Sequence, residues 1–206
     1  MTESNAHPIL VVGAGISGVT AALEAAEAGQ EVILVEREPS VGGRVVRNLH
    51  YFPKMCPPTC GMEINTRRLD RSPRVRVLPG TRVTKAESTG DGWKVRLTSA
   101  PRYVNDRCTA CGDCSKACPA EVSNGFDVGM SKAPNIRMLH PDAWPQRFFL
   151  DDRSACPAGC TACADACQYD AIDLDATEQE ETVEVSAVVL ATGWKPYPLE
   201  KLPEFG

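Results

Sequence analysis

The chain has 206 residues, of which 43% are hydrophobic and 24% charged, a composition typical of a folded soluble domain rather than a disordered tail. No apolar run approaches the roughly 20 residues that a membrane helix needs, and the start of the chain does not resemble a secretory signal. The net charge of -5 argues against broad nucleic-acid binding. We therefore expect a cytoplasmic protein whose ten cysteines serve metal or redox chemistry rather than disulfide bonds.

The cysteines and the negative charge gather in the same part of the chain. Eight of the ten cysteines lie between Cys108 and Cys167. Residues 108–176 hold ten acidic side chains against five Lys/Arg, so the rest of the chain is balanced in charge. We interpret the sequence as three zones: an α/β domain at 1–100, a cysteine-rich insert at 101–176, and a return to the first domain at 177–206.

The first zone has the pattern of a dinucleotide-binding fold. Residues 8–13 are continuously apolar and β-branched, which is typical of a buried parallel strand. A glycine-rich turn follows, then a predicted helix over 19–28 that ends at Gly29, then a second strand over 31–36. A turn of this kind between a strand and a helix presents backbone N–H groups to a pyrophosphate.

The glycine spacing and one acidic residue specify the ligand further. Gly13 permits the tight turn, Gly15 lets the backbone approach the phosphates, and Gly18 lets helix and strand pack closely. Glu36 ends the second strand, where it can accept ribose hydroxyls and disfavours a 2′-phosphate. NAD and FAD remain as candidate ligands.

Two later segments favour FAD. Gly42, Gly43 and Arg44 follow the ribose acid, and an apolar strand over 186–191 runs into Ala191, Thr192 and Gly193. Both features resemble the FAD-binding flavoproteins that have two dinucleotide domains. That family also has a meander like the short strands that we predict at 74–78, 82–88 and 93–97, with a hairpin turn at 88–92.

The same family closes its FAD site with a Gly-Asp motif that comes after the Ala-Thr-Gly strand, and no Gly-Asp occurs between Gly193 and Gly206. We therefore expect a partial chain whose Rossmann-like FAD fold is incomplete at its C-terminus. Such a fold would bind flavin poorly, or would need further residues or a partner.

The insert resembles a two-cluster bacterial ferredoxin. Its first run, Cys108, Cys111, Cys114 and Cys118 followed by Pro119, has the C-x2-C-x2-C-x3-C-P spacing. The second run departs from it: the gap between Cys156 and Cys160 is one residue longer, and Gln168 replaces the proline after Cys167. We also expect a strand-like tail over 169–175. The predicted fold class is thus α/β, with an inserted α+β ferredoxin-like domain.

In this spacing the fourth cysteine of each run serves the other cluster. One 4Fe-4S cluster would then use Cys108, Cys111, Cys114 and Cys167, and the other would use Cys118, Cys156, Cys160 and Cys163. Zinc is the main rival, although zinc sites usually use two well-separated pairs. Disulfides are weaker still in a reducing compartment.

The pair Cys56 and Cys60 leaves three interpretations open. The two thiols can be a redox dithiol near the flavin, ligands for a further cluster or a substrate sulfur, or structural thiols in a proline-rich loop. The basic run over 44–76 is interpreted mainly as solvated surface, with contact to an anionic cofactor or an acidic partner as the alternative. We expect four large side chains to be core residues: Trp144, Trp194, Met130 and Met138.

The order of the pieces resembles one family. An FAD fingerprint, a ferredoxin insert and then an Ala-Thr-Gly strand is the order found in the A subunits of heterodisulfide reductases. Several stretches further resemble the A subunits of the quinone-interacting membrane-bound oxidoreductase and of sulfur-oxidising heterodisulfide-reductase-like complexes. These stretches are residues 51–65, 101–111, 152–160 and 191–197.

The resemblance implies a flavoprotein oxidoreductase subunit of sulfur metabolism that carries FAD and two 4Fe-4S clusters. Electrons would pass between the flavin, the clusters and other subunits of a heterodisulfide-reductase-like or quinone-interacting complex. In the quinone-interacting relatives, adenylylsulfate reductase is a further partner. Contact with the inner membrane face would come only through partners. Two alternatives stay open: a non-catalytic relay or assembly module with a vestigial flavin site, and a stand-alone FAD-dependent enzyme.

Overall fold

The computed structural model describes residues 7–48, 50, 52–194, 201–202 and 204. A four-stranded parallel sheet with strand order β11-β1-β2-β3 forms the centre of the first domain. Its strands are β1 (Ile9–Val12), β2 (Val32–Glu36), β3 (Val75–Pro79) and β11 (Ala187–Leu190). The predicted α/β class is confirmed, because β1, the following helix and β2 form the expected strand–helix–strand unit.

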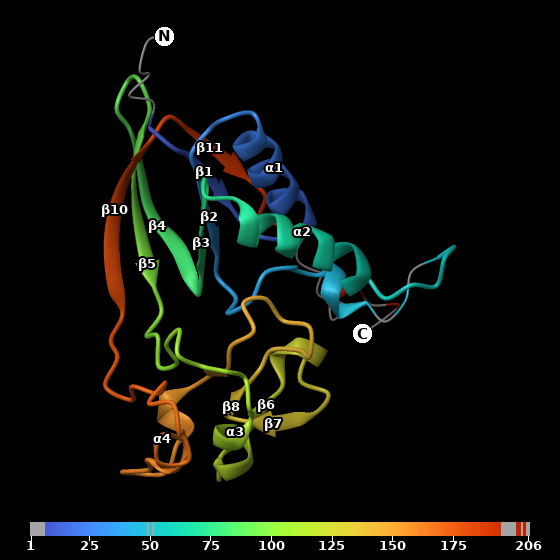
Figure 1. Ribbon diagram of the computed structural model, residues 1–206, viewed down its shortest axis with the longest axis vertical. Helices are drawn as coiled ribbons and strands as arrows, with labels where there is room; N and C mark the ends of the chain where they lie inside the picture. The colour runs from blue at the N-terminus through green and yellow to red at the C-terminus, as the bar shows by residue number, and fades with distance from the viewer. Residues whose placement is uncertain (1–6, 49, 51, 195–200, 203, 205–206) are drawn as a thin grey trace.

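Two helices cover one face of this sheet (Figure 1). They are α1 (Ile16–Glu27) and α2 (Thr59–Arg71). Successive side chains of a strand point to opposite faces, so Val11 and Leu34 pack against α1, whereas their neighbours Leu10 and Ile33 face away from the helices. The helix α1 begins directly after Gly15, earlier than predicted, and Gly29 follows its last residues with a positive φ of 94°.

A second, antiparallel sheet with strand order β10-β5-β4 covers the other face. It consists of β4 (Thr81–Ser88), β5 (Trp93–Ser99) and β10 (Gln179–Val185). Val95, Leu97 and Val185 pack against Leu10 and the rest of that face. The predicted hairpin between β4 and β5 is present, but the first predicted strand of the meander, β3, belongs to the parallel sheet.

The insert leaves the first domain after β5 and returns at β10, below the two sheets in Figure 1. It consists of short elements around a small core that includes Val104, Ile136 and Leu150 together with Cys114 and Cys163. Its helices and 3-10 turns are α3 (Asp113–Ala117), η2 (Gly125–Asp127), η3 (Arg153–Ala155) and α4 (Ala162–Asp165). Its strands are β6 (Glu121–Ser123), β7 (Lys132–Pro134), β8 (Ile136–Arg137) and β9 (Phe149–Leu150). The domain boundaries at 100/101 and 176/177 stay predictions.

Some expectations from the sequence were wrong. The tail over 169–175 is not a strand: within it only Ile172 pairs, through one isolated bridge to Val104. Met130 and Trp194 are not core residues, since they are 85% and 68% exposed. Met130 lies in the turn between β6 and β7, and Trp194 follows the last strand of the parallel sheet, where the Arg44 guanidinium lies 4.2 Å from its ring centroid.

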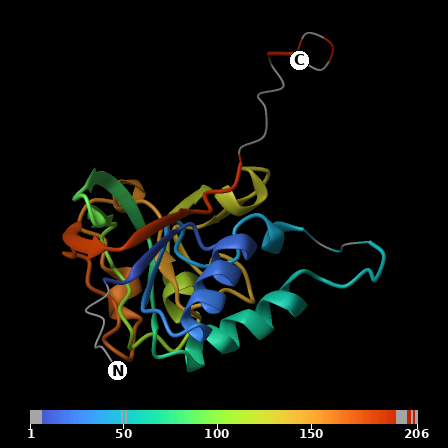
Figure 2. The same ribbon diagram turned by 90° about the horizontal axis from the view of Figure 1, so that it is seen from above.

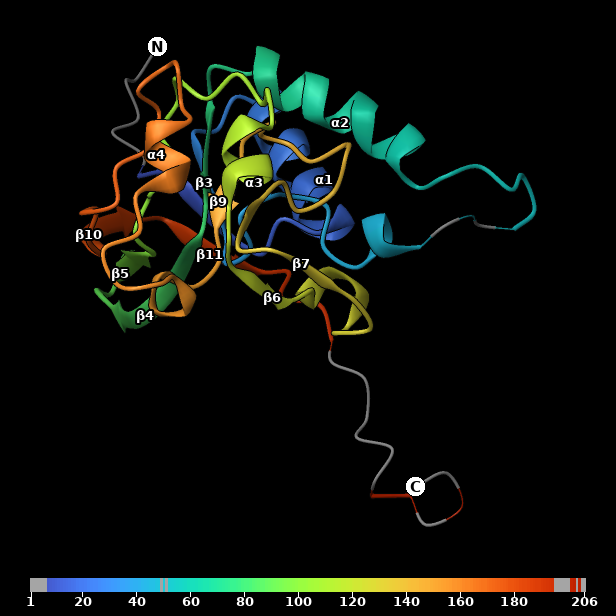
Figure 3. The ribbon, with the colours of Figure 1, turned by 90° about the horizontal axis from the view of Figure 1, so that it is seen from below.

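The segment before α2 projects from the body of the molecule. This loop follows the 3-10 turn η1 (Val45–Arg47), and Figures 2 and 3 both show it extending sideways, away from the sheets. In the part of the chain that the structure describes, no helix is both long and apolar enough to cross a membrane.

Candidate functional site

The glycine turn after β1 is closely packed at two of its three glycines. A Cβ atom on Gly18 would lie 1.8 Å from the Gly13 carbonyl oxygen, and one on Gly13 would lie 2.4 Å from the Ala191 carbonyl oxygen. Gly13 also has a φ of 101°, a backbone angle that residues other than glycine rarely adopt. A Cβ on Gly15, in contrast, would meet nothing within 4 Å. Gly13 and Gly18 are therefore required by packing, whereas Gly15 keeps the space in front of α1 open.

Glu36 holds the turn from the end of β2. Its side chain is buried, with Oε2 accepting a hydrogen bond from the Ala14 backbone N–H at 2.7 Å and Oε1 accepting one from the Glu38 N–H at 3.0 Å. The carboxylate is thus fixed beside the turn, and it lines the same cleft as Gly13 and Gly15.

The second pair of glycines lies against the first turn. The Gly42 N–H donates to the Ala14 carbonyl at 2.8 Å, and a Cβ on Gly43 would lie 3.0 Å from the Gly15 Cα. On the other side, the Ala191 N–H donates to the Val12 carbonyl at 2.8 Å. Three segments that are far apart in sequence therefore meet at the carboxyl end of the parallel sheet, where open α/β sheets bind their ligands.

These segments border a cleft of about 840 Å³. Every residue predicted to contact the dinucleotide lines it except Gly18, which is used in packing. These lining residues are Gly13, Gly15, Glu36, Gly42, Gly43, Arg44, Ala191, Thr192 and Gly193. Four arginines also line the cleft: Arg37 and Arg82, which pair with Glu38 and Glu178, and Arg44 and Arg47, which bring positive charge to it. Its size, open helix N-terminus and cationic wall fit the pyrophosphate and ribose of a dinucleotide.

The insert contributes part of the cleft wall, which the sequence did not predict. Phe126 and Leu139 of the insert line the cleft together with the glycine turn. Arg47 fastens Phe126 in place, because its Nη1 donates to the Gly125 carbonyl at 2.7 Å and to the Phe126 carbonyl at 3.1 Å. Behind Phe126, the buried His140 ring stacks at a centroid distance of 5.3 Å, and burial lowers the pKa of His140.

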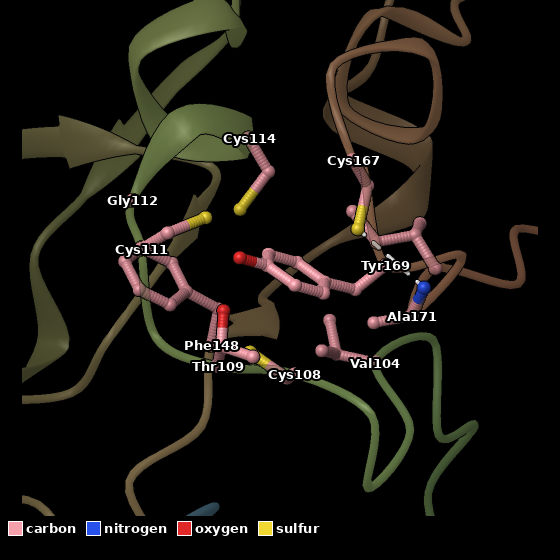
Figure 4. Close-up of a pocket in the computed structure, with 11 residues that line it drawn as sticks. Val104, Cys108, Thr109, Cys111, Gly112, Cys114, Phe148, Cys167, Tyr169 and Ala171 are labelled. Atoms are coloured by element: carbon pink, nitrogen blue, oxygen red, sulfur yellow. Dashed lines mark hydrogen bonds between the residues drawn. The ribbon is translucent and has the colours of Figure 1, made fainter.

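A second cavity lies in the insert and is lined by four cysteines from both runs (Figure 4). Phe148 and Tyr169 complete its wall. The loop through the first run turns back on itself at Ala110 and Gly112, which have positive φ angles of 58° and 88°. The cysteines are Cys108, Cys111, Cys114 and Cys167, the set that the ferredoxin spacing assigns to one cluster. Their role as ligands stays a prediction.

Cys114 lies in an apolar environment close to other cysteines. Its side chain is buried, and burial together with the neighbouring Cys108 and Cys111 raises the pKa of the thiol to about 12. A metal centre binds the thiolate form, so occupation of this site would release the proton. Four thiols that face one small apolar cavity are the number and type of ligand that a 4Fe-4S cluster takes.

Among the other four predicted ligands, Cys118 and Cys156 lie close to Cys163. Burial raises the pKa of the Cys163 thiol, and the nearby Cys118 and Cys156 raise it further. Cys118, Cys156 and Cys163 share the insert core, while the half-buried Cys160 sits in a turn that its N–H closes onto the Pro157 carbonyl at 3.0 Å. Among the described residues, no three Cys, His, Asp or Glu side chains converge on a point the size of one metal ion.

Cys56 and Cys60 lie apart from both cavities. Cys60 is exposed in the first turn of α2, and the half-buried Cys56 precedes that helix in the projecting loop. Neither residue lines the cleft or the cysteine-ringed cavity. The structure thus does not bring the pair to the predicted flavin site, and a redox role for it stays a prediction.

Two known families match parts of the chain. Residues 8–68 match the family "FAD dependent oxidoreductase", and residues 107–172 match the family "4Fe-4S dicluster domain". The chain therefore combines a flavin-binding oxidoreductase segment with an iron–sulfur dicluster segment, and the two predicted types of cofactor are confirmed.

Curated relatives identify the family more closely. The chain is 33% identical to the A subunit of the ferredoxin:CoB-CoM heterodisulfide reductase of Methanosarcina acetivorans, over 98% of this chain and 26% of the relative. It is 30% identical to the A subunit of the H(2):CoB-CoM heterodisulfide,ferredoxin reductase of Methanothermobacter marburgensis, over 96% of this chain and 30% of the relative. Over almost its whole length, the chain is thus a homologue of one part of the A subunits of heterodisulfide reductases. It spans less than a third of the length of these relatives.

Solved structures resemble a smaller part of the chain. L-proline dehydrogenase from P. horikoshii matches with a TM-score of 0.39 and 16% identity, over 46% of this chain and 19% of that one. Thioredoxin reductase from Lactococcus lactis matches with a TM-score of 0.37 and 22% identity, over 43% of this chain and 30% of that one.

Proposed function

We propose that this chain is the electron-transfer part of a heterodisulfide-reductase-like oxidoreductase, in which one FAD and two 4Fe-4S clusters work together. The observation that carries the proposal is that Phe126 and Leu139, from the cysteine-rich insert, form part of the wall of the dinucleotide cleft. The insert is therefore built against the flavin site rather than attached by a free linker. This arrangement suits electron exchange between flavin and clusters.

Different residues of the cleft would bind different parts of FAD. The open N-terminus of α1, cleared by Gly15, would receive the pyrophosphate, and Arg44 and Arg47 would offset its charge. Glu36, already fixed by two backbone N–H groups, would accept the ribose hydroxyls. When bound, FAD supplies two-electron chemistry and the iron–sulfur clusters carry single electrons.

The cysteines would hold the clusters in the crossed arrangement. Four of them surround the cavity of Figure 4, and of the remaining four Cys118 and Cys156 lie close to Cys163. Residues of the insert core exclude water from one side of each site, because Cys114 and Cys163 are both buried. The solvent exposure of a cluster is one of the factors that set its reduction potential.

The relatives support a proposal about partner subunits. The names of the curated relatives describe subunits of heterodisulfide reductases, so we propose partner subunits that deliver or receive electrons at the clusters. The narrower resemblance to quinone-interacting and sulfur-oxidising complexes adds three proposals: a role in sulfur metabolism, an encounter with adenylylsulfate reductase, and attachment to a membrane through partners.

Cofactor analysis of anaerobically purified protein tests the proposal. We expect about eight irons and matching acid-labile sulfide, as two cubanes require, together with one FAD per chain. Cys114→Ser should lose about half of the iron, whereas Cys60→Ser, a matched control outside both cavities, should lose none. Zinc without sulfide, or iron without FAD, would contradict the proposal.

A further inference from the structure

Asn135 is the most completely enclosed polar residue of the insert. It lies between β7 and β8 and has none of its surface exposed. Its Nδ2 donates to the Asp152 carbonyl at 2.7 Å and to Cys156 Sγ at 3.2 Å, and its Oδ1 accepts from the Asp152 N–H at 3.0 Å. Its backbone N–H and carbonyl also have partners, in Ala120 and Asp151. Buried polar groups are normally satisfied in this way, but here one partner is a predicted cluster ligand.

The direction of the Asn135 amide is fixed by its partners. Asp152 presents both a backbone donor and a backbone acceptor to the amide. Turning the amide over would set Nδ2 against the Asp152 N–H and Oδ1 against the Asp152 carbonyl, and both hydrogen bonds would be lost. The NH₂ group therefore has to face Cys156.

The segment that leads to Cys156 is held firmly around this contact. The carboxylate of Asp152 accepts from the Ser154 N–H at 2.8 Å and so caps η3, which ends directly before Cys156. Asp151 pairs with the buried Arg137 at 2.8 Å. Cys156 opens the second run, in which the gap to Cys160 is one residue longer than the corresponding gap of the first run. Asn135 thus positions the cysteine at which the spacing departs from the usual pattern.

We propose that Asn135 is a positioning residue for the cluster held by Cys118, Cys156, Cys160 and Cys163, and that its N–H raises the reduction potential of that cluster. The inference rests on the proposed function. A hydrogen bond to a ligand sulfur stabilises negative charge there, and reduction adds an electron, so the reduced cluster gains more from the bond than the oxidised one. At the other predicted cluster, the sulfur of Cys167 receives a backbone N–H from Ala171 at 3.4 Å.

Redox titration of the full chain, followed by electron paramagnetic resonance, tests this role. Asn135→Leu keeps the branched shape and neutral charge of the side chain but removes the hydrogen bond to Cys156 together with the two to Asp152. We expect the midpoint of one cluster to fall, with roughly a tenfold change in the ratio of reduced to oxidised cluster at a fixed potential, or ~59 mV for one electron. Loss of one signal in Cys156→Ser identifies which midpoint belongs to that cluster.

Asn105→Leu is the matched control. Asn105 also lies in the insert, where its side chain accepts from the Arg107 N–H at 2.9 Å and donates to the Asp170 carbonyl at 3.4 Å. Neither partner is a sulfur, so both midpoints should stay unchanged. A shift of both midpoints by Asn135→Leu, or of neither, would overturn the role of Asn135.

A second measurement does not depend on the folding of a variant. In the wild-type chain with ¹⁵N-labelled asparagine side chains, pulsed paramagnetic resonance of the reduced clusters should detect one coupled side-chain nitrogen. Its absence would overturn the inference while leaving the proposed function intact. A wild-type chain that assembles no iron–sulfur cluster at all would instead overturn the proposed function.

Discussion

The hydroxyl of Ser40 and the main chain of Trp144 exchange hydrogen bonds across 104 residues of sequence: Ser40 Oγ donates to the Trp144 carbonyl at 2.9 Å and accepts from the Trp144 N–H at 3.0 Å. The Val41 N–H donates to the same carbonyl at 3.0 Å, and the Trp144 Nε1–H donates to Asp70 at 3.0 Å. Trp144 belongs to the insert, whereas the other three residues belong to the first domain. This contact fastens the cysteine-rich insert beside the cleft, since Ser40 and Val41 both line the cleft.

Removal of the Ser40 hydroxyl should therefore loosen the insert. In Ser40→Ala the Trp144 N–H loses its acceptor at a site where Ser40 is 3% exposed. We expect the free energy of unfolding to fall by about 1–3 kcal/mol, as measured by urea denaturation. Ser186→Ala, which removes an exposed hydroxyl, is the control and should change little. Equal stability of the two variants would show that the fastening contributes nothing.

The glycine turn predicts opposite results for two substitutions that look alike. Gly18→Ala places a methyl group 1.8 Å from the Gly13 carbonyl oxygen, so the backbone must move, and we expect a loss of about 3 kcal/mol or more in stability. Gly15→Ala meets no atom within 4 Å and should fold normally, but its methyl group projects toward the phosphate position and should weaken FAD binding. Denaturation and flavin titration on both variants check the pair.

Glu36 should matter for affinity more than for folding. In Glu36→Gln the one remaining side-chain oxygen can still accept from the buried Ala14 N–H, while the half-buried Glu38 N–H loses its acceptor, and the charge that would strengthen the bond to a ribose hydroxyl is lost. We expect FAD to bind more weakly by about tenfold, or roughly 1.4 kcal/mol, as measured by flavin fluorescence. Glu31 lies at the opposite end of β2, where it pairs with Arg74 at the surface. As the control, Glu31→Gln should leave the affinity for FAD unchanged.

The parts of the fold that follow from local pattern were predicted from the sequence. The strand–helix–strand unit depends on apolar runs and on a glycine turn in which Gly18 packs on Gly13, although Gly13 itself packs on Ala191, far along the chain. The grouping of Cys167 with Cys108, Cys111 and Cys114 around one cavity matches a spacing rule, although the residues are far apart along the chain.

The parts that depend on tertiary contacts were not predicted. The helix α2 follows two prolines and contains Gly61 and Asn65, so its sequence carries little helix propensity; it is held by burial of Met62 and Leu69 against α1. The strand β10 is mostly polar and exposed, with Val185 as its one buried residue, and it forms by pairing with β5. Phe126 gives no local signal of its position in the cleft wall.

Acid should destabilise the protein through His140. Burial lowers the pKa of His140 from the ordinary 6.5, with Asp142 acting in the opposite direction and Arg47 in the same direction. As the pH falls, His140 is therefore protonated more readily in the unfolded chain than in the folded one. The stability contributed by neutral His140 is present above pH 6.5 and is lost as the pH falls below it.

Urea denaturation at pH 7.5 and pH 5.5 measures this loss. His140→Phe keeps a ring stacked on Phe126 and removes an Nε2 atom that has no hydrogen-bond partner in the described structure. We expect this variant to lose less stability on acidification than the wild type does. His7→Gln, at a half-exposed side chain, should behave as the wild type. An unchanged acid response in His140→Phe would assign the effect to other groups.

The crossed arrangement of cysteines can be separated from a sequential one by two double variants. In the crossed arrangement Cys114 and Cys167 serve the same cluster, as their shared cavity indicates, whereas Cys114 and Cys118 serve different clusters. Cys114→Ser with Cys167→Ser should then retain about four irons, and Cys114→Ser with Cys118→Ser should retain almost none. If each run held its own cluster, the two results would be exchanged. Iron and sulfide analysis of both proteins therefore decides between the arrangements, because each variant removes two thiols and differs only in which cluster they would bind.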